Sequence, residues 1–524
     1  MRALPGNVAR VKEAMSTTDT VTPARAGRRE WLGLAILSLP ALLVSMDLTV
    51  LHLAAPTISA DLRPTAAQLL WIVDIYGFLI AGFLITMGTL GDRIGRRLLL
   101  LIGAAAFGVA SVVAAFSPNA ETLIAARALL GVAGATLAPS TVALIRNMFH
   151  DPAQRTTAIS IWFMSFMAGS AVGPLIGGAL LEVAWWGSTF LIGVPVMVLL
   201  LAFGPVLLPE HRAPLPGRMD LLGALTALGA ILSIVYGLKR VAEDGLTVTP
   251  LVTVAVGLVL GTVFLRRQRT VAAPLLDLDL FRLRTVSVSV LALTIGAVAV
   301  GGVGYLSAQY LQLVADQSPI MAGLWMLPPL LIGIVTTIVT PIVGRRIGPG
   351  AKTTLGLVVA AIGLLVVSRT NDDSGVGYVV AGLVLLFGGI MPVLALGVDI
   401  VVAAAPPART GAASAITETA QELGIALGIA VLGSISTAIY RQQMRDVVPP
   451  EGVPADAVQA ARSTLGAAGE VSARLGPALL ESAERAFTDG MRLAAVVSAV
   501  LLMITAIIAA VTLRRIRATG GGPH

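Results

Sequence analysis

Five carboxylates lie inside long apolar segments of the chain, where charged side chains are rare. They are Asp47, Asp74, Asp399, Glu418 and Glu422. An acid near the centre of a bilayer costs at least about 2.5 kcal/mol, so each is expected to face the protein interior or a wet cavity. Carboxylates in such places bind protons and cations. The pattern therefore predicts proton or cation chemistry within a membrane.

Two of these acids are expected at a similar depth. Asp47 lies late in the first apolar segment and Asp74 early in the second, which places both in the same half of the membrane. Both are predicted to bind a proton or a cation. Arg127, one to two turns into the fourth segment, is predicted to compete with that ligand for an acid. The alternative for Arg127 is a plain buried ion pair.

The other acids differ in expected depth. Glu418 and Glu422 are four residues apart, so they share one helix face near the middle of the membrane. This face is predicted to line a cavity and bind protons or cations, with tolerated polar lining as the alternative. Asp399 is close to the end of its segment and is expected at the interface.

Aromatic residues flank one of the acids. Trp71 and Tyr76 lie on either side of Asp74 in the sequence. An aromatic face beside a carboxylate suits a lipophilic cation, because cation–π attraction adds to charge neutralisation. Both are therefore predicted to line the substrate cavity, although packing or anchoring at the membrane interface is the alternative.

Composition limits the kind of protein that positions these residues. The 524 residues are 56% hydrophobic and 12% charged, about half of the charge of a soluble chain. The chain has no cysteine and only four histidines, so thiolate metal sites and thiol nucleophiles are excluded. We expect no catalytic residue, metal or cofactor. A membrane-bound enzyme or receptor is one alternative. It would need a nucleophile, metal ligands or a large ligand domain, and the four histidines, the absence of cysteine and the lack of a soluble domain argue against it.

Fourteen apolar runs are long enough to cross a bilayer. They lie near 31–53, 69–89, 98–116, 122–145, 158–181, 187–208, 221–237, 248–265, 285–311, 321–343, 352–367, 377–404, 411–440 and 490–513. The sequence thus predicts an all-α integral membrane protein with fourteen transmembrane helices.

The runs fall into two groups of six. We expect cytoplasmic tails at 1–30 and 514–524, bundles at 31–210 and 285–513, an inserted pair of helices with flanking loops at 211–284, and a long outer segment at 441–489. A loop rich in Gly and Arg follows the second span of each group, at 88–97 and 344–350. This repeat predicts two similar halves with a substrate site between them. Segment 441–489 is expected either as short amphipathic helices or as a solvated loop.

Basic residues indicate the orientation. On the side of the N-terminus the loops and tails carry 25 Lys and Arg, and the other side carries 9, of which five lie in 441–489. Because short cytoplasmic loops of membrane proteins are enriched in Lys and Arg, both termini are predicted to be cytoplasmic. The basic residues are spread over many loops, which gives no support for nucleic-acid binding.

One stretch superficially resembles a phosphate-binding loop. Residues 344–353 end in Gly350-Ala351-Lys352-Thr353. A phosphate-binding loop needs Gly immediately before Lys and follows a buried strand, whereas here Ala intervenes between two membrane-length runs. ATP is therefore not expected as a partner.

Three motifs resemble those of a transporter family. They are the loop 88–97, the string Arg127-Ala-Leu-Leu-Gly131-Val-Ala-Gly134, and the run Gly169-x3-Gly173-Pro174-x2-Gly177-Gly178. They resemble motifs A, B and C of major facilitator drug:proton antiporters. Met46-Asp47-Leu-Thr49 and Leu70-Trp71-Ile-Val-Asp74-Ile-Tyr76 look like the fourteen-span QacA, SmvA and LfrA group of multidrug efflux pumps.

The resemblance implies roles for matching residues. Asp47, Asp74 and Glu418 match acids implicated in protonation and cation recognition. A gating loop is implied at Gly91, Asp92, Arg93, Gly95, Arg96 and Arg97, and an antiporter glycine motif at Gly169, Gly173, Pro174, Gly177 and Gly178. In span ten, where QacA has an acid that favours divalent cations, this chain has Gly333, so a preference for dications is not implied.

We therefore expect a major facilitator fold of two six-helix bundles plus two inserted helices in a bacterial cytoplasmic membrane. The expected function is proton-coupled efflux of lipophilic cationic drugs, dyes and quaternary ammonium antiseptics by alternating access. The alternative is a dedicated exporter of one natural-product antibiotic on the same fold. The expected partners are protons, lipophilic cations and the lipid bilayer.

Overall fold

The computed structural model describes nine ranges of the chain. They are 25–210, 220–244, 247–271, 278–343, 348–371, 376–404, 410–447, 454–470 and 477–513. Within these ranges nearly every residue is helical and none lies in a β-strand. Fourteen helices there are long and apolar enough to cross a membrane. The prediction of an all-α membrane protein with fourteen spans is confirmed.

The first six spans form one bundle. Its helices are α2 (Arg28–Leu62), α3 (Ala66–Ile94), α4 (Arg96–Ala115), α5 (Ala120–Met148), α6 (Pro152–Val183), α7 (Ser188–Leu191) and α8 (Gly193–Leu207). The sixth span, Ser188–Leu207, crosses as expected, and only its regular hydrogen bonding is divided at Ile192, whose backbone stays helical with φ −55° and ψ −34°. Pro195 has no N–H for a helical bond to Leu191, and the division places this proline in the first turn of α8, where it is tolerated.

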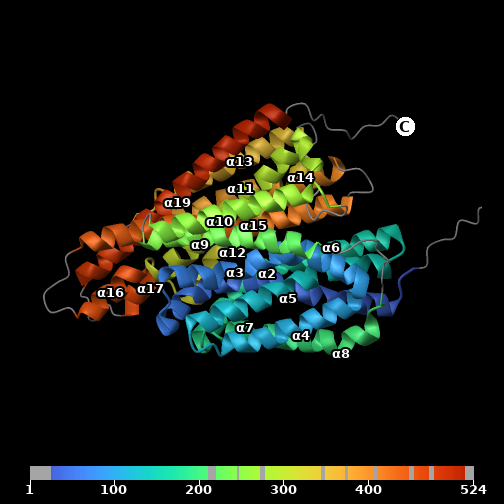
Figure 1. Cartoon of the computed structure of the whole chain (residues 1–524), viewed down its shortest axis with the longest axis horizontal. Coiled ribbons are helices and arrows are strands. Elements are labelled where there is room, and N and C mark those ends of the chain that lie inside the picture. The colour runs from blue at the N-terminus through green and yellow to red at the C-terminus, as the bar shows by residue number, and fades with distance from the viewer. Residues whose placement is uncertain are drawn as a thin grey trace, which may run out of the picture.

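The last six spans form the second bundle, and two helices are inserted between the bundles. The second bundle contains α11 (Arg284–Leu313), α12 (Pro319–Val343), α13 (Pro349–Val367), α14 (Gly377–Ala404), α15 (Thr410–Asp446) and α19 (Pro477–Thr512), preceded by the short η1 (Leu280–Arg282). The inserted pair is α9 (Leu221–Asp244) and α10 (Val248–Gln268). Figure 1 shows the pair lying along the boundary between the bundles, and α9 contacts both α3 and α15.

The long helices of both bundles end at two opposite faces of the molecule, which we name by the segments that lie there. The tail face is the end where α2 begins and α19 finishes. The loop face is the opposite end, where α16 (Ala455–Ser463) and α17 (Leu465–Glu470) lie (Figure 1, left). These two short helices occupy the segment expected as helices or a solvated loop. Ala457 and Ala461 of α16 are buried while Gln459 is exposed, so the structure favours the amphipathic-helix interpretation.

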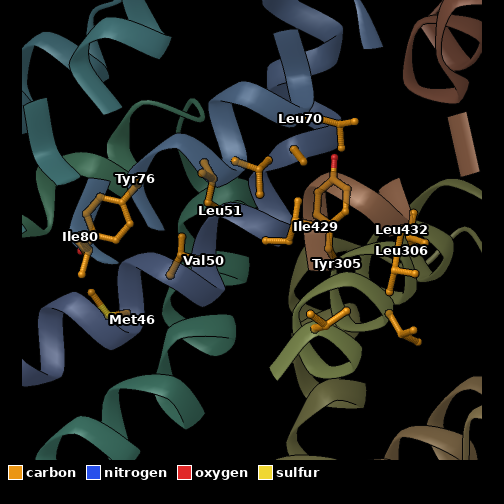
Figure 2. Packing of buried hydrophobic residues seen from close by; sticks show 14 of the residues in the cluster. Met46, Val50, Leu51, Leu70, Tyr76, Ile80, Tyr305, Leu306, Ile429 and Leu432 are labelled. Carbon is orange, nitrogen blue, oxygen red and sulfur yellow. The ribbon is translucent and has the colours of Figure 1, made fainter. Parts of the chain in front are cut away.

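The two bundles pack directly against each other in the half near the loop face. A β-carbon at Gly178 of α6 would lie 2.7 Å from the carbonyl oxygen of Pro319 in α12. Farther along, Leu70 of α3 lies beside Tyr305 of α11 (Figure 2). The hydroxyl oxygens of Ser59 in α2 and Thr464, which joins α16 to α17, are 3.4 Å apart. The loop face is therefore closed in this structure.

The inserted pair is fastened together at the tail face. Asp220, just before α9, accepts hydrogen bonds from Arg267 Nε at 2.7 Å and from the backbone N–H of Gly223 at 2.8 Å. The side chain of Asp220 is fully buried. This ion pair joins the beginning of α9 to the end of α10.

Candidate functional site

Arg127 and Asp47 form a buried ion pair within the first bundle. Arg127 Nη1 of α5 donates to Asp47 Oδ2 of α2 at 2.5 Å. Its Nε donates to the carbonyl oxygen of Ile72 in α3 at 3.1 Å, and its guanidinium carbon lies 4.5 Å from the centre of the Tyr76 ring. The arginine is 0% exposed. It therefore joins three helices around one neutralised charge.

Asp74 forms its ion pair with a different residue, which the sequence did not predict. Lys239 Nζ of α9 lies 3.0 Å from Asp74 Oδ2 and donates to Oδ1 at 3.0 Å. Both side chains are no more than 1% exposed. Asp47 and Asp74 are thus not two carboxylates sharing a cavity in this structure, because each has its own buried cation.

Trp71 completes the environment of this second pair. It lies three residues before Asp74 on α3, and Lys239 Nζ is 4.0 Å from the centre of its ring. An ammonium held between a carboxylate and an indole face has two favourable partners. The expected aromatic and acidic neighbours are therefore together, but the cation between them belongs to the protein itself.

The seventh span was predicted to end at Gly237, which placed Lys239 in the loop after it. Helix α9 instead continues to Asp244 and carries Lys239 into the protein. Lys239 and Arg240 are two of the four basic residues that lie outside the expected cytoplasmic side in short loops. Such exceptions to the positive-inside pattern were a signal that could have identified Lys239.

Tyr76 is a buried aromatic residue with acids of both bundles in its surroundings. It is 0% exposed, and its hydroxyl has no hydrogen-bond partner among the described residues. The carboxylates of Asp47 and Glu422 are both within electrostatic range of this hydroxyl. The Tyr76 hydroxyl is therefore near one acid of each bundle without a hydrogen bond to either.

Glu418 and Glu422 differ from Asp47 and Asp74 because neither forms an ion pair with any described residue. Glu418 is exposed and Glu422 partly exposed on the same face of α15. Glu422 Oε2 is buried without a hydrogen-bond partner among the residues described. Both lie in the half of α15 near the tail face, and Arg146 of α5 is within electrostatic range of Glu418. Two uncompensated carboxylates are thus open to a ligand.

These residues belong to a chain with recognisable relatives. A profile of the Major Facilitator Superfamily matches residues 37–429. The chain belongs to the major facilitator superfamily. The family is one of transporters rather than enzymes, and the fourteen apolar helices make this member a multi-pass membrane protein.

Relatives within the superfamily match over most of their lengths. The multidrug efflux pump LfrA of Mycolicibacterium smegmatis is 43% identical over 507 residues, which cover 96% of this chain and 100% of LfrA. The methyl viologen resistance protein SmvA of Salmonella typhimurium is 35% identical, with coverage of 88% and 93%. The tetracenomycin C resistance and export protein of Streptomyces glaucescens is 31% identical, with coverage of 94% and 93%.

A solved structure of the superfamily supports the fold. A bacterial homologue of the human lysosomal transporter Spinster, in an inward-facing and unoccupied conformation, matches with a TM-score of 0.65. The two are 18% identical, and the match covers 94% of this chain and 98% of that chain. At this identity the likeness shows the major facilitator fold alone.

The expected gating loop joins α3 to α4 at the tail face. Gly95 has a φ of 118° and ends α3, a conformation that favours glycine. Arg97 donates to the carbonyl oxygens of Pro205 and Leu208 at 3.2 and 3.0 Å, and its Nε lies 3.6 Å from Glu210 Oε2. These contacts remain within the first bundle. The side chain of Asp92 lies outside the described residues.

The expected glycine motif on α6 has two packing partners. A β-carbon at Gly177 would lie 2.8 Å from Val50 of α2, and Gly169 and Gly173 also face α2. Gly178 instead faces α12 of the second bundle. The carbonyl oxygen of Pro174 would lie 2.5 Å from a β-carbon at Gly323 of α12. The motif therefore packs α6 within its own bundle and against the other bundle.

The remaining candidates lie apart from this group. Asp399 is exposed near the tail-face end of α14, as expected for an interfacial acid. His52 packs edge-on against Tyr305, with ring centres 5.6 Å apart. Residues 344–347, at the start of the apparent phosphate-binding stretch, lie outside the described residues. Within the described part of the chain no group of three or more potential ligands could hold a metal ion.

Proposed function

We propose that this transporter exports lipophilic cations from the cytoplasm in exchange for protons. The observation that carries the proposal is the pair Glu418 and Glu422, two carboxylates on one face of a membrane helix without an ion-pair partner among the described residues. A carboxylate within a membrane helix that lacks an ion-pair partner is costly in its charged form, so it favours either a proton or a cationic ligand. Competition between these two ligands for the same carboxylates is the basis of antiport.

The orientation follows from the charge of the loops. The 25 basic residues on the side of the N-terminus favour a cytoplasmic tail face. The loop face is closed, and Glu418 is exposed in the half of α15 near the tail face. Both observations support a state that is open to the cytoplasm.

The export cycle uses both groups of acids. A cation enters from the tail face and binds Glu418 and Glu422 as their counter-charge. The bundles then rock, which opens the loop face and brings outside water to Asp47 and Asp74. Protons from outside bind Asp47 and Asp74, which weakens their hold on Arg127 and Lys239, and bind Glu418 and Glu422, which releases the transported cation outward. The neutralised protein returns and releases the protons inside.

The names of the relatives support drug export and leave two substrate ranges open. LfrA is named as a multidrug efflux pump and SmvA as a methyl viologen resistance protein. The tetracenomycin C resistance and export protein and the puromycin resistance protein of Streptomyces alboniger favour the second candidate, a dedicated exporter of one antibiotic. A competition panel separates them, because a dedicated exporter ignores ethidium and quaternary ammonium compounds.

Transport in proteoliposomes tests the proposal. The purified full chain is reconstituted, a pH gradient is imposed and ethidium movement is followed by fluorescence. We expect uptake that depends on the gradient and is lost in Glu418→Gln. Asp399→Asn is the matched control, since it removes an exposed membrane acid outside the group and is expected to keep transport. Ethidium movement that persists after the gradient is collapsed would contradict proton coupling.

A further inference from the structure

Lys239 places an ammonium where a transported cation would be expected to bind. Its Nζ lies 3.0 Å from Asp74 Oδ2 and 4.0 Å from the centre of the Trp71 ring. A carboxylate and an indole face are the two groups that best recognise a lipophilic ammonium or phosphonium. The resident lysine therefore satisfies the recognition chemistry of a cation site.

The surroundings make this occupant difficult to replace with water. Trp71, over whose ring Lys239 Nζ lies, packs against an apolar cluster formed by Phe78 of α3, Val235 of α9, and Ala426 and Ala430 of α15. All four are no more than 1% exposed. Removing the ammonium from this environment leaves a buried carboxylate without compensation, which is strongly unfavourable. Lys239 can therefore leave Asp74 only when another cation or a proton neutralises the carboxylate in its place.

The position of α9 connects this exchange to the movement of the bundles. The helix contacts α3 of the first bundle and α15 of the second. α15 also carries Glu418 and Glu422. A change in the angle between the bundles therefore changes the contacts that hold Lys239 against Asp74.

We infer that Lys239 is a tethered cation which occupies the Asp74–Trp71 site between transport events and is displaced from it by the exported lipophilic monocation. The inserted helix α9 is then part of the transport machinery rather than a spacer between bundles. The inference rests on the proposed cation export. It adds a second binding position for the cation, nearer the loop face than the α15 glutamates.

Equilibrium binding of tetraphenylphosphonium to the purified full chain tests the competition. Lys239→Gln removes the internal competitor, so we expect binding to tighten by about tenfold, the size of a typical coupling between two ligands. Adding Asp74→Asn to Lys239→Gln should abolish the gain, because the carboxylate is then missing. Arg240→Gln is the matched control: it removes the same charge from the next position on α9, where Arg240 stacks on Tyr236, and should bind like the wild type.

A second measurement uses the wild-type protein and does not depend on the folding of a variant. The chain has three lysines, Lys12, Lys239 and Lys352, so amine labelling can be read at each by mass spectrometry. Phenyl isothiocyanate, which enters membranes, should label Lys239 slowly while it is paired with Asp74. Saturating tetraphenylphosphonium should increase labelling of Lys239 by about fivefold or more and leave Lys352 unchanged.

The outcomes separate this inference from the proposed function. Equal binding by Lys239→Gln and Arg240→Gln, or a gain that survives Asp74→Asn, would show that Lys239 only fastens α9 to α3. Labelling of Lys239 that tetraphenylphosphonium leaves unchanged or reduces would also overturn the inference. A wild type that binds the cation with these signatures but does not transport it under a pH gradient would instead contradict the proposed function.

Discussion

The acids of the first bundle and those of the second bundle are held in opposite ways. Asp47 and Asp74 each have a buried cation, Arg127 and Lys239, within 3.0 Å. Glu418 and Glu422 have no ion pair with any described residue and are exposed or partly exposed. The acids of the first bundle are therefore neutralised by the protein's own cations in this state. On α15, by contrast, the negative charge of the glutamates must be neutralised by a ligand.

Closing the molecule permanently at the loop face should have the largest effect. The chain has no cysteine, so a Ser59→Cys/Thr464→Cys variant contains one pair, replacing hydroxyl oxygens that are 3.4 Å apart. Its disulfide should abolish transport while cations still bind from the tail face, because Asp47 and Asp74 never meet outside water. A reducing agent should restore transport, and each single cysteine variant is the control. Full transport by the oxidised pair would contradict a loop face that opens in the cycle.

Removing the uncompensated charge should have the next largest effect. Glu418→Gln and Glu422→Gln together should weaken tetraphenylphosphonium binding by about a hundredfold, since a loss of about 1.4 kcal/mol at each acid is tenfold. Equilibrium dialysis measures the affinity, and Asp399→Asn should bind like the wild type. If the double variant kept the wild-type affinity, the cation would be compensated elsewhere.

Breaking a compensated pair should affect stability more than removing an uncompensated acid. Asp47→Asn leaves the buried Arg127 without a counter-charge and should lower the free energy of unfolding by about 3 kcal/mol. Replacing both partners, as in Asp47→Leu/Arg127→Met, should cost far less, because no charge is stranded. Glu422→Gln should have little effect on stability. Unfolding in mixed micelles compares the three variants, and an equal loss in all of them would remove the distinction between the bundles.

The ion pair that fastens the inserted helices should have the smallest effect. Burial alone would raise the pKa of Asp220, but hydrogen bonds from Arg267 and Gly223 outweigh it and lower this pKa below its ordinary value. The pair therefore stabilises the fold above about pH 4, and this contribution is lost as the pH falls through the lowered pKa. Asp220→Asn should cost about 2 kcal/mol at pH 7. The difference from the wild type should shrink in acid, and a constant difference would contradict the ionised pair.

Much of the fold could be predicted because lipid imposes a length and a composition on each span. The apolar runs located all fourteen helices, and the rarity of charge within them identified the acids. The division of hydrogen bonding at Ile192 in the sixth span depended on one proline whose effect the hydropathy of the segment does not record.

The partners of the acids could not be predicted in the same way. Depth along a helix follows from counting residues, but the neighbour at that depth depends on how helices are arranged around it. Asp47 and Asp74 were expected at similar levels, which gave no reason to assign Arg127 to one and Lys239 to the other. The boundary of the seventh span at Gly237 hid Lys239, because a lysine at the end of an apolar run is usually at the interface.

Proton release on cation binding directly tests whether protons and cations exchange at Glu418 and Glu422. Tetraphenylphosphonium is added to the purified full chain in weakly buffered solution, and the pH is recorded together with the amount bound. We predict that binding releases protons and that the release disappears in the Glu418→Gln/Glu422→Gln variant while Asp399→Asn retains it. Cation binding without proton release, or equal release from the variant without the two glutamates, would contradict exchange at α15.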